Sequence, residues 1–213
     1  MTRNVIEVRD LTAGAVRGAS FTVPQGTMYA LLGRYGSGKT TVLETVAGQR
    51  RPLAGSVRVA GVDPYAHPEA LRVGTVWRDG GLFPGLTVAE VVDTWRRWTL
   101  DPLGRDEALR RVGLSGLAAT PFERLGAGAR RRLDLALALV GRSDVLFLDE
   151  PTWGLAGADA RQVRTTLGEL TSGGVTVLLA TRDPQEACLA DRIGILDGGR
   201  LVTGRAPARP HAA

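Results

Sequence analysis

The chain has 213 residues, of which 44% are hydrophobic and 23% are charged, and its formal net charge is +5. This composition excludes a disordered or fibrous chain and predicts one soluble globular domain, since no apolar run approaches the roughly 18 residues of a membrane span. The arginines are spread along the chain, so the positive charge alone indicates no nucleic-acid or lipid partner. The single cysteine, Cys188, excludes a disulfide within the chain and is expected to be buried.

Short apolar and β-branched runs predict strands along most of the chain. They are found at 5–8, 19–23, 28–32, 56–60, 73–77, 145–149, 175–180, 192–196 and 200–204. Helical patterns separate several of these runs, which predicts an α/β domain with a largely parallel sheet.

The strand pattern is interrupted between residues 82 and 142, where helical patterns occupy 88–98, 106–112 and 130–140. We interpret this block as a helical subdomain inserted into one domain of residues 1–204. The tail at 205–213 is rich in Pro, Ala and Arg and is expected to be disordered.

A phosphate-binding loop is predicted in "GRYGSGKTT". It lies between the strand at 28–32 and an apolar-periodic helix, the setting in which G-x-x-x-x-G-K-[ST] binds nucleotide phosphates. Lys39 is the one lysine among 27 Lys and Arg residues, and its compact ammonium can reach phosphates that a planar arginine cannot match. The Thr40 hydroxyl is placed for Mg²⁺. The predicted nucleotide-binding residues are Gly33, Arg34, Tyr35, Gly36, Ser37, Gly38, Lys39, Thr40 and Thr41.

A carboxylate pair follows the apolar strand in "VLFLDE". Asp149 is expected to hold Mg²⁺ through water, and Glu150 is expected to orient or deprotonate an attacking water. Together with the loop, the pair predicts a site for ATP or GTP with Mg²⁺.

Three further stretches make the pattern specific: "GLFPGLTVAEVV", "ERLGAGARRRLDLALALVGRSDVLFLDEPTWGLAGADAR" and "TVLLATRDPQEACLADRIGILDGGRLVTG". With them, residues 5–204 resemble the nucleotide-binding subunit of an ATP-binding cassette (ABC) transporter, and 130–152 resembles the drug-exporter branch typified by daunorubicin-resistance ATPases. The resemblance implies a P-loop NTPase fold of the ABC type, with a mostly parallel core sheet, an antiparallel β part near the N-terminus and the helical insertion.

The same resemblance implies an energy-coupling ATP hydrolase of a membrane exporter, with ATP and Mg²⁺ as cofactors. It implies a second nucleotide-binding subunit and transmembrane subunits as partners, no nucleic acid, and a cytoplasmic position on the inner face of the cell membrane.

The signature motif departs from the family pattern. Family subunits sandwich ATP between one subunit's loop and the partner's Leu-Ser-Gly-Gly-Gln, whose serine hydroxyl is absent here. The matching residues are Leu125, Gly126, Ala127, Gly128 and Ala129, of which the last four are expected to face ATP across the dimer. We expect a weaker contact, made through Gly128 and the N-terminus of a helix starting near Arg130.

Three other motif positions differ. The family's Q-loop glutamine falls at Arg78, its switch histidine at Arg182 and its D-loop aspartate at Ala156. Arginine cannot ligate a cation but can grip phosphate with two hydrogen bonds. Three interpretations stay open: the subunit holds ATP but turns it over poorly, Arg182 or Arg78 acts as an arginine finger, or both point into solvent. With Lys39 and Glu150, the two arginines complete the candidate catalytic set.

Other features are less specific. Residues 10–20 contain no aromatic side chain to stack on a base, so weak selection between ATP and GTP is expected. Val92, Trp95 and Trp98 recur at helical spacing, which favours helix core over the alternative of a docking surface for a membrane subunit. The basic run at 130–132 is interpreted as a solvated helix start.

Two other functions stay open. One is a non-hydrolysing, degenerate ABC subunit with a structural or regulatory role in an asymmetric dimer, which the altered positions favour and Glu150 argues against. The other is a soluble ABC protein acting on ribosomes or nucleic acid, which would normally show tandem cassettes or a charged linker.

Overall fold

A six-stranded sheet forms the centre of the computed structural model, which describes residues 3–205. Its strand order is β5-β6-β7-β3-β8-β9. The strands are β3 (Met28–Leu32), β5 (Val73–Val76), β6 (Val145–Asp149), β7 (Thr176–Thr181), β8 (Arg192–Asp197) and β9 (Arg200–Arg205). The first five strands in this order run parallel, and β9 returns antiparallel to β8. Every residue of β6 and β7 is buried, which explains their continuous apolar runs.

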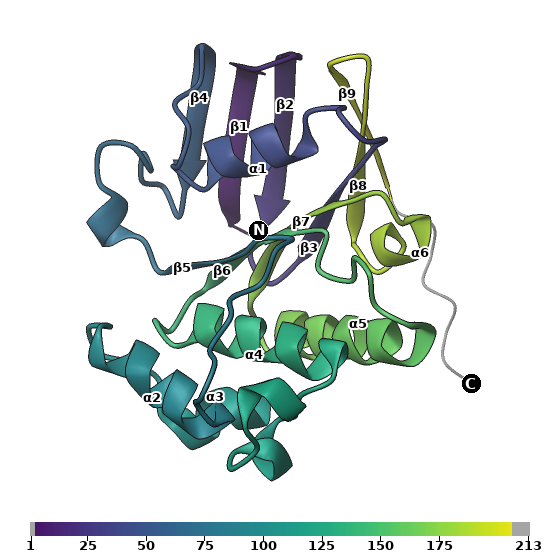
Figure 1. Cartoon of the computed structure of the whole chain (residues 1–213). Coiled ribbons are helices and arrows are strands. Elements are labelled where there is room, and N and C mark those ends of the chain that lie inside the picture. Colours follow the sequence, from purple (N-terminus) through teal and green to yellow (C-terminus); the bar gives the residue numbers. More distant parts are fainter. Residues whose placement is uncertain (1–2, 206–213) are drawn as a thin grey trace.

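A smaller antiparallel sheet stands beside the core sheet. It contains β1 (Asn4–Ala13), β2 (Val16–Pro24) and β4 (Ala54–Val59) in the order β2-β1-β4. The helix α1 (Lys39–Val46) lies between the two sheets in Figure 1 and packs its apolar face against both. The smaller of the two hydrophobic cores in the described residues is formed by buried side chains between these three layers.

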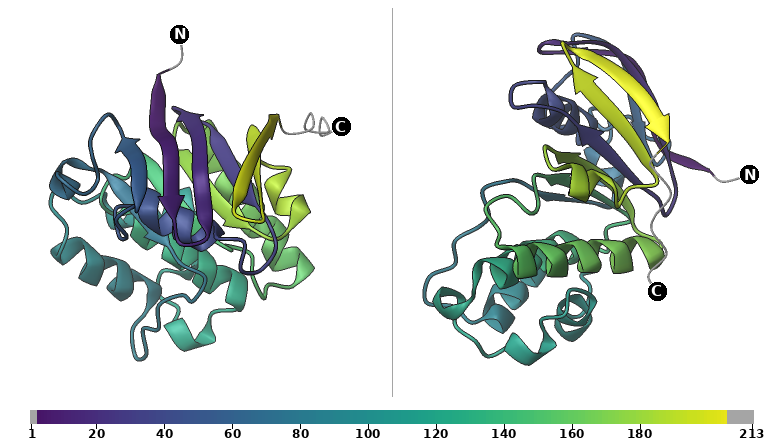
Figure 2. Two further views of the ribbon diagram at one scale, coloured as in Figure 1. Left: turned by 90° about the horizontal axis from the view of Figure 1, so that it is seen from above. Right: turned by 90° about the vertical axis from the view of Figure 1, so that its right-hand side faces the viewer.

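Helices cover the other face of the core sheet. The helices α4 (Ala127–Leu139) and α5 (Gly157–Ser172) run directly beneath the strands, and α2 (Val88–Arg97) and α3 (Arg105–Arg111) lie farther out (Figures 1 and 2). The short α6 (Pro184–Ala187) follows β7, and three short 3-10 segments occupy Pro68–Ala70, Ser115–Leu117 and Phe122–Arg124. The larger hydrophobic core joins the sheet to these helices.

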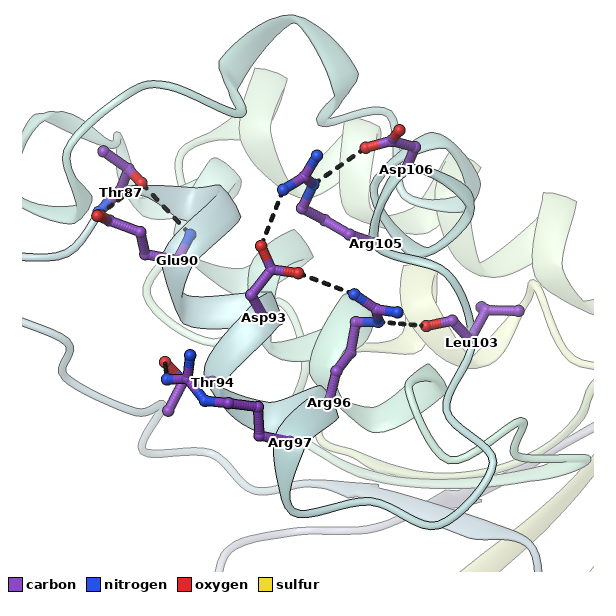
Figure 3. A network of polar contacts seen from close by, with 9 residues as sticks. All are labelled: Thr87, Glu90, Asp93, Thr94, Arg96, Arg97, Leu103, Arg105 and Asp106. Carbon is purple, nitrogen blue, oxygen red and sulfur yellow. Dashed lines mark hydrogen bonds and ion pairs between the residues drawn. The ribbon is translucent and has the colours of Figure 1, made fainter.

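Polar contacts fix α2 against α3, as Figure 3 shows. Thr87 and Glu90 form a capping box at the start of α2, each side chain accepting from the other residue's backbone N–H. The carboxylate of Asp93 accepts from Arg96 at 3.0 Å and from Arg105 at 2.8 Å. Partly exposed ion pairs such as these contribute little each, but together they hold the outer helices in one arrangement.

The predicted fold class is confirmed, and every predicted strand is present. The helix α4 begins at Ala127, three residues before the predicted start, because the small residues of its first turn carry no apolar period. The strand β9 extends to Arg205, one residue into the predicted tail, and residues 206–213 lie outside the described part of the chain.

Three burial predictions were wrong. Cys188 is exposed, because the short α6 turns Glu186 and Ala187 toward the core and leaves the next side chain outside. Val92 is buried, but Trp95 and Trp98 are 39% and 78% exposed, so the stripe is not wholly core. The basic run at 130–132 is not solvated, since Arg131 and Arg132 are 7% and 6% exposed.

Candidate nucleotide site

The loop between β3 and α1 needs its glycines. A Cβ on Gly33 would lie 2.5 Å from the Leu196 carbonyl oxygen, and one on Gly38 would lie 2.5 Å from a methyl of Val16. Gly38 also has φ of 99°, a region that L side chains rarely adopt. It caps α1 without a side-chain hydrogen bond, so the first N–H groups of the helix can receive an anion.

The Lys39 side chain folds back over this loop. Its ammonium donates to the carbonyl oxygens of Gly33 at 2.8 Å and Arg34 at 3.0 Å, and lies 4.0 Å from Glu150 Oε1. Burial lowers the pKa of Lys39, while the nearby Glu150 carboxylate opposes that shift. The loop therefore holds the ammonium beside the carboxylate pair.

Asp149 provides oxygen ligands at the end of β6. Its Oδ2 accepts from the Thr40 hydroxyl at 3.0 Å, and its Oδ1 is buried with no hydrogen-bond partner among residues 3–205. Burial raises the pKa of Asp149, and the Thr40 bond partly offsets this. A buried, unpartnered carboxylate oxygen beside a hydroxyl fits Mg²⁺, which takes one or two protein oxygens and fills its octahedron with water and phosphate.

Glu150 is held by Arg182. The Arg182 Nε donates to Oε1 at 2.9 Å, and the backbone N–H of the same residue donates to Oε2 at 3.3 Å. The guanidinium carbon lies 4.1 Å from the centre of the Trp153 ring and 5.9 Å from that of Tyr35. These contacts rule out the solvent-facing interpretation for Arg182.

A cleft of about 480 Å³ gathers most of the predicted residues. It is lined by Tyr35, Gly36, Gly38, Lys39, Thr40, Thr41, Glu44, Trp77, Arg78, Asp79, Asp149, Glu150 and Arg182. Sequence reasoning missed Glu44, Trp77 and Asp79, although the aromatic residue directly before Arg78 was a signal that could have been used. The Arg78 side chain is 40% exposed and lies 3.9 Å from Asp79, so it is free to turn toward a ligand.

The signature residues do not line this cleft. Gly126 caps α4, and Ala127, Gly128 and Ala129 form its first turn. Gly128 is buried, and a Cβ there would lie 2.7 Å from the Asp159 side chain of α5. Ala156, at the D-loop position, caps α5 and is also outside the cleft. Within one chain, these residues and the phosphate loop stay apart.

Comparison with known proteins agrees with this arrangement. The model of the ABC transporter family matches residues 16–153.

The chain belongs to the ABC transporter family.

Its relatives include import proteins and an export protein, the Nod factor export ATP-binding protein I of Ralstonia nicotianae, which is 35% identical over 92% of this chain and 63% of its own length. The daunorubicin resistance ATP-binding protein DrrA3 of Streptomyces coeruleorubidus is 36% identical over 88% of this chain and 62% of its own length. The sulfate/thiosulfate import ATP-binding protein CysA of Caulobacter vibrioides is 36% identical over 93% of this chain and 62% of its own. The chain thus spans about three fifths of the length of these relatives.

Among solved structures, a dimer of the ATP-binding cassette MJ0796 in a post-hydrolysis state with ADP and Pi aligns with a TM-score of 0.81. The alignment covers 95% of this chain and 99% of that one at 20% identity, so it shows the fold. In the part of this ABC chain that the structure describes, no helix is long and apolar enough to cross a membrane.

Arg131 joins α4 to the segment that carries Arg78. Its guanidinium donates to the carbonyl oxygens of Trp77 at 2.8 Å and Arg78 at 2.5 Å, and it lies 3.6 Å from Asp134. The Asp134 carboxylate in turn accepts from the backbone N–H of Gly81. The helix α4, whose first turn occupies the signature position of the family, is therefore bonded directly to residues 77–81. We call residues 77–81, which contain the family's Q-loop position, the Q-loop segment.

No aromatic side chain near the first strand is free to stack on a base. Phe21, the first aromatic after residue 20, is 6% exposed and stacks on Tyr29 with ring centres 4.9 Å apart. In this ABC chain an adenine would therefore rest on other contacts, and Tyr35, 82% exposed in the phosphate loop, lies at the cleft wall.

Proposed function

We propose that this chain is an ATP-binding, energy-coupling subunit of an ABC membrane transporter that binds Mg·ATP and hydrolyses it slowly. The observation that carries the proposal is the convergence of Lys39, Thr40, Asp149 and Glu150 on one cleft, at the carboxyl ends of parallel strands β3 and β6. This is the edge of a parallel sheet where open α/β proteins bind ligands.

Each residue of the cleft has a separate task in this proposal. The α1 N–H groups and Lys39 bind the β- and γ-phosphates, and Thr40 and Asp149 would hold Mg²⁺. The metal supplies charge neutralisation of the phosphates when bound. Glu150 takes a proton from the attacking water, whose oxygen bonds the γ-phosphorus as the electrons of the bond to the bridging oxygen leave with ADP.

Slow turnover is proposed because Glu150 is already engaged. Both of its oxygens accept from Arg182, so an attacking water must share or displace these bonds. The same contact argues against Arg182 as an arginine finger, since its Nε points at a carboxylate. Arg78 offers no oxygen to a cation. The contact also favours the second candidate, a degenerate subunit that holds ATP and does not hydrolyse it.

We infer that transport is outward. The support is the likeness to the Nod factor export protein, together with the stretch at 130–152 that resembles the drug-exporter branch. The import proteins among the relatives are about as similar, so the inference rests on that stretch.

Membrane subunits are proposed to dock beside α2. A second cleft of about 410 Å³ is lined by most residues of the segment 73–83, including Phe83, and by Trp95 and Thr99. Trp95 lines it, and Trp98 lies next to Trp95 with ring centres 6.2 Å apart. Both rings are exposed, and large exposed aromatics mark contact surfaces. Because the Q-loop segment forms one wall of both clefts, a subunit seated here would sense the nucleotide site. We therefore propose a position at the cytoplasmic face of a membrane.

A second nucleotide-binding subunit is proposed as the other partner. MJ0796 is a dimer with ADP and Pi, and the signature residues of this chain do not reach its own cleft. They could therefore contact nucleotide only in another copy or in a related subunit.

Nucleotide binding by Lys39 variants tests the proposed function. Removing the ammonium should weaken ATP binding at least about tenfold, because a hydrogen bond to a charged group is worth roughly 1.5–3 kcal/mol. Lys39→Arg keeps the charge but not the compact shape, so it should lose nearly as much as Lys39→Ala. Isothermal titration with ATP and Mg²⁺ measures this, with Arg111→Ala on the far helix α3 as the control. Unchanged affinity in both Lys39 variants would contradict the site.

A further inference from the structure

The indole ring of Trp153 packs against the flat face of the Arg182 guanidinium. The indole centre lies 4.1 Å from the guanidinium carbon, well within the distance at which an aromatic face attracts a cation. The Arg182 side chain is only 27% exposed, so water weakens this attraction less than at an open surface. Its Nη2 atom is buried and has no hydrogen-bond partner in the described chain, so the guanidinium is held by its Nε bond and by the ring beneath it.

The backbone fixes the indole in this place. Residues 150–154 form a tight turn, in which the Trp153 N–H donates to the Glu150 carbonyl at 2.9 Å. Glu150 and Gly154 both have positive φ, of 48° and 74°. The Trp153 side chain is 53% exposed and belongs to neither hydrophobic core. On this turn, outside both cores, the Trp153 ring lies against the Arg182 guanidinium.

Four side chains are connected in series. Trp153 holds the guanidinium, the guanidinium holds Glu150 Oε1, and that same oxygen lies 4.0 Å from the Lys39 ammonium. A third cleft, of about 330 Å³, opens beside Trp153 and Arg182, so the guanidinium has space to leave Glu150 if the indole no longer holds it.

We propose that Trp153 is a positioning residue that clamps Arg182 onto Glu150, and that this clamp limits the rate of ATP turnover. The inference rests on the proposed function. While the clamp is closed, Glu150 Oε1 accepts from the Arg182 guanidinium and Oε2 accepts from the Arg182 backbone N–H. Opening it frees Oε1 to accept from the attacking water. The clamp acts on the proton-accepting step and not on phosphate binding, so it should change kcat and leave the affinity for ATP nearly constant.

A double-mutant cycle tests the clamp. Trp153→Ala and Arg182→Ala should each raise kcat at least threefold with less than a twofold change in the dissociation constant of ATP. Trp153→Phe, which keeps an aromatic face, should raise kcat less than Trp153→Ala. Because both residues act through one contact, the double variant should be no faster than the faster single variant. Arg111→Ala controls for the loss of an arginine. Unchanged or lower kcat in both single variants, or multiplicative effects in the double variant, would overturn the clamp.

A second readout needs no turnover. In the protein without nucleotide, Arg182→Ala should make Trp153 more accessible to an iodide or acrylamide quencher, measured as the difference from matching Trp153→Phe proteins. No change in quenching would overturn the contact. If wild type and all variants bind ATP but none hydrolyses it, the clamp is wrong. If wild type does not bind ATP, while quenching still reports the Arg182 contact, the proposed function fails instead.

Discussion

Glu186 shows how the chain holds an acidic side chain close to the nucleotide site. It is 1% exposed on α6, and its Oε1 has no hydrogen-bond partner among the described residues. Burial raises the pKa of Glu186, and hydrogen bonds with Thr181 and Thr152 partly oppose this. A carboxyl whose pKa is raised on folding stabilises the native state in its protonated form. This contribution is complete below the unfolded pKa of about 4.3 and is lost as pH rises through the folded pKa.

Glu186→Gln should therefore change the pH dependence of stability. The variant keeps a neutral group at every pH, so its free energy of unfolding relative to wild type should rise as pH increases from about 4 toward 8. Urea unfolding at a series of pH values measures the difference. Glu169→Gln, on the exposed side of α5, is the matched control for the Glu-to-Gln change. A difference between Glu186→Gln and wild type that stays flat with pH would contradict the burial effect.

For single residues, sequence spacing predicted the candidate phosphate and metal ligands but not the residues that support them. Lys39, Thr40 and Asp149 follow from local motifs next to a strand, and the structure brings all three into one cleft. The Arg131 bonds to Trp77 and Arg78 join segments more than 50 residues apart, so no local pattern could show them. The contact of Trp153 with Arg182 has the same origin, since it depends on β6 and β7 being neighbours.

Among the elements, the N-terminus of α4 is the part of this chain that we propose to contact a second nucleotide site. Gly126 caps the helix with φ of −65° and ψ of 162°, a backbone that any residue can adopt. A Cβ there would meet nothing within 4 Å. Serine is a favoured N-cap residue, so the position can accept a hydroxyl without strain.

Gly126→Ser should strengthen dimerisation driven by ATP. Added to the Glu150→Gln background, which limits hydrolysis, it should lower the dimer dissociation constant at least about tenfold, because one hydroxyl bond to a charged phosphate is worth roughly 1.5–3 kcal/mol. Sedimentation with and without Mg·ATP measures the change. Gly126→Ala supplies the same Cβ without the hydroxyl and should have little effect. Equal dimerisation by the Ser and Ala variants would contradict a role for this position across the dimer.

The elements themselves were largely predictable because their apolar periods are strong. The central strands β6 and β7 are fully buried and carry mainly apolar runs, and α2 buries Val88, Val91 and Val92 at helical spacing. The first turn of α4 was not predictable, because its Gly and Ala residues give no apolar contrast. The exposure of Trp95 and Trp98 was also missed, since a helical stripe alone does not distinguish a core from a docking surface.

For the whole molecule, the topology explains why the site lies where it does. The strands β3 and β6 run parallel and are both adjacent to β7, so the loop after one and the carboxylates at the end of the other meet at the same edge. The Q-loop segment leaves β5 at this edge and continues toward α2, which connects the nucleotide cleft to the outer helices. A nucleotide that moves Arg78 would therefore act on the surface proposed for a membrane subunit.

Steady-state ATP hydrolysis by the wild-type chain and by Glu150→Gln, with ATP binding measured on both, tests most directly whether this cleft is a slow ATPase. We expect Mg²⁺-dependent turnover by the wild type that Glu150→Gln abolishes while ATP binding is retained. The same turnover in both proteins would contradict Glu150 as the proton acceptor. ATP binding without turnover in the wild type would show instead a subunit that only holds nucleotide.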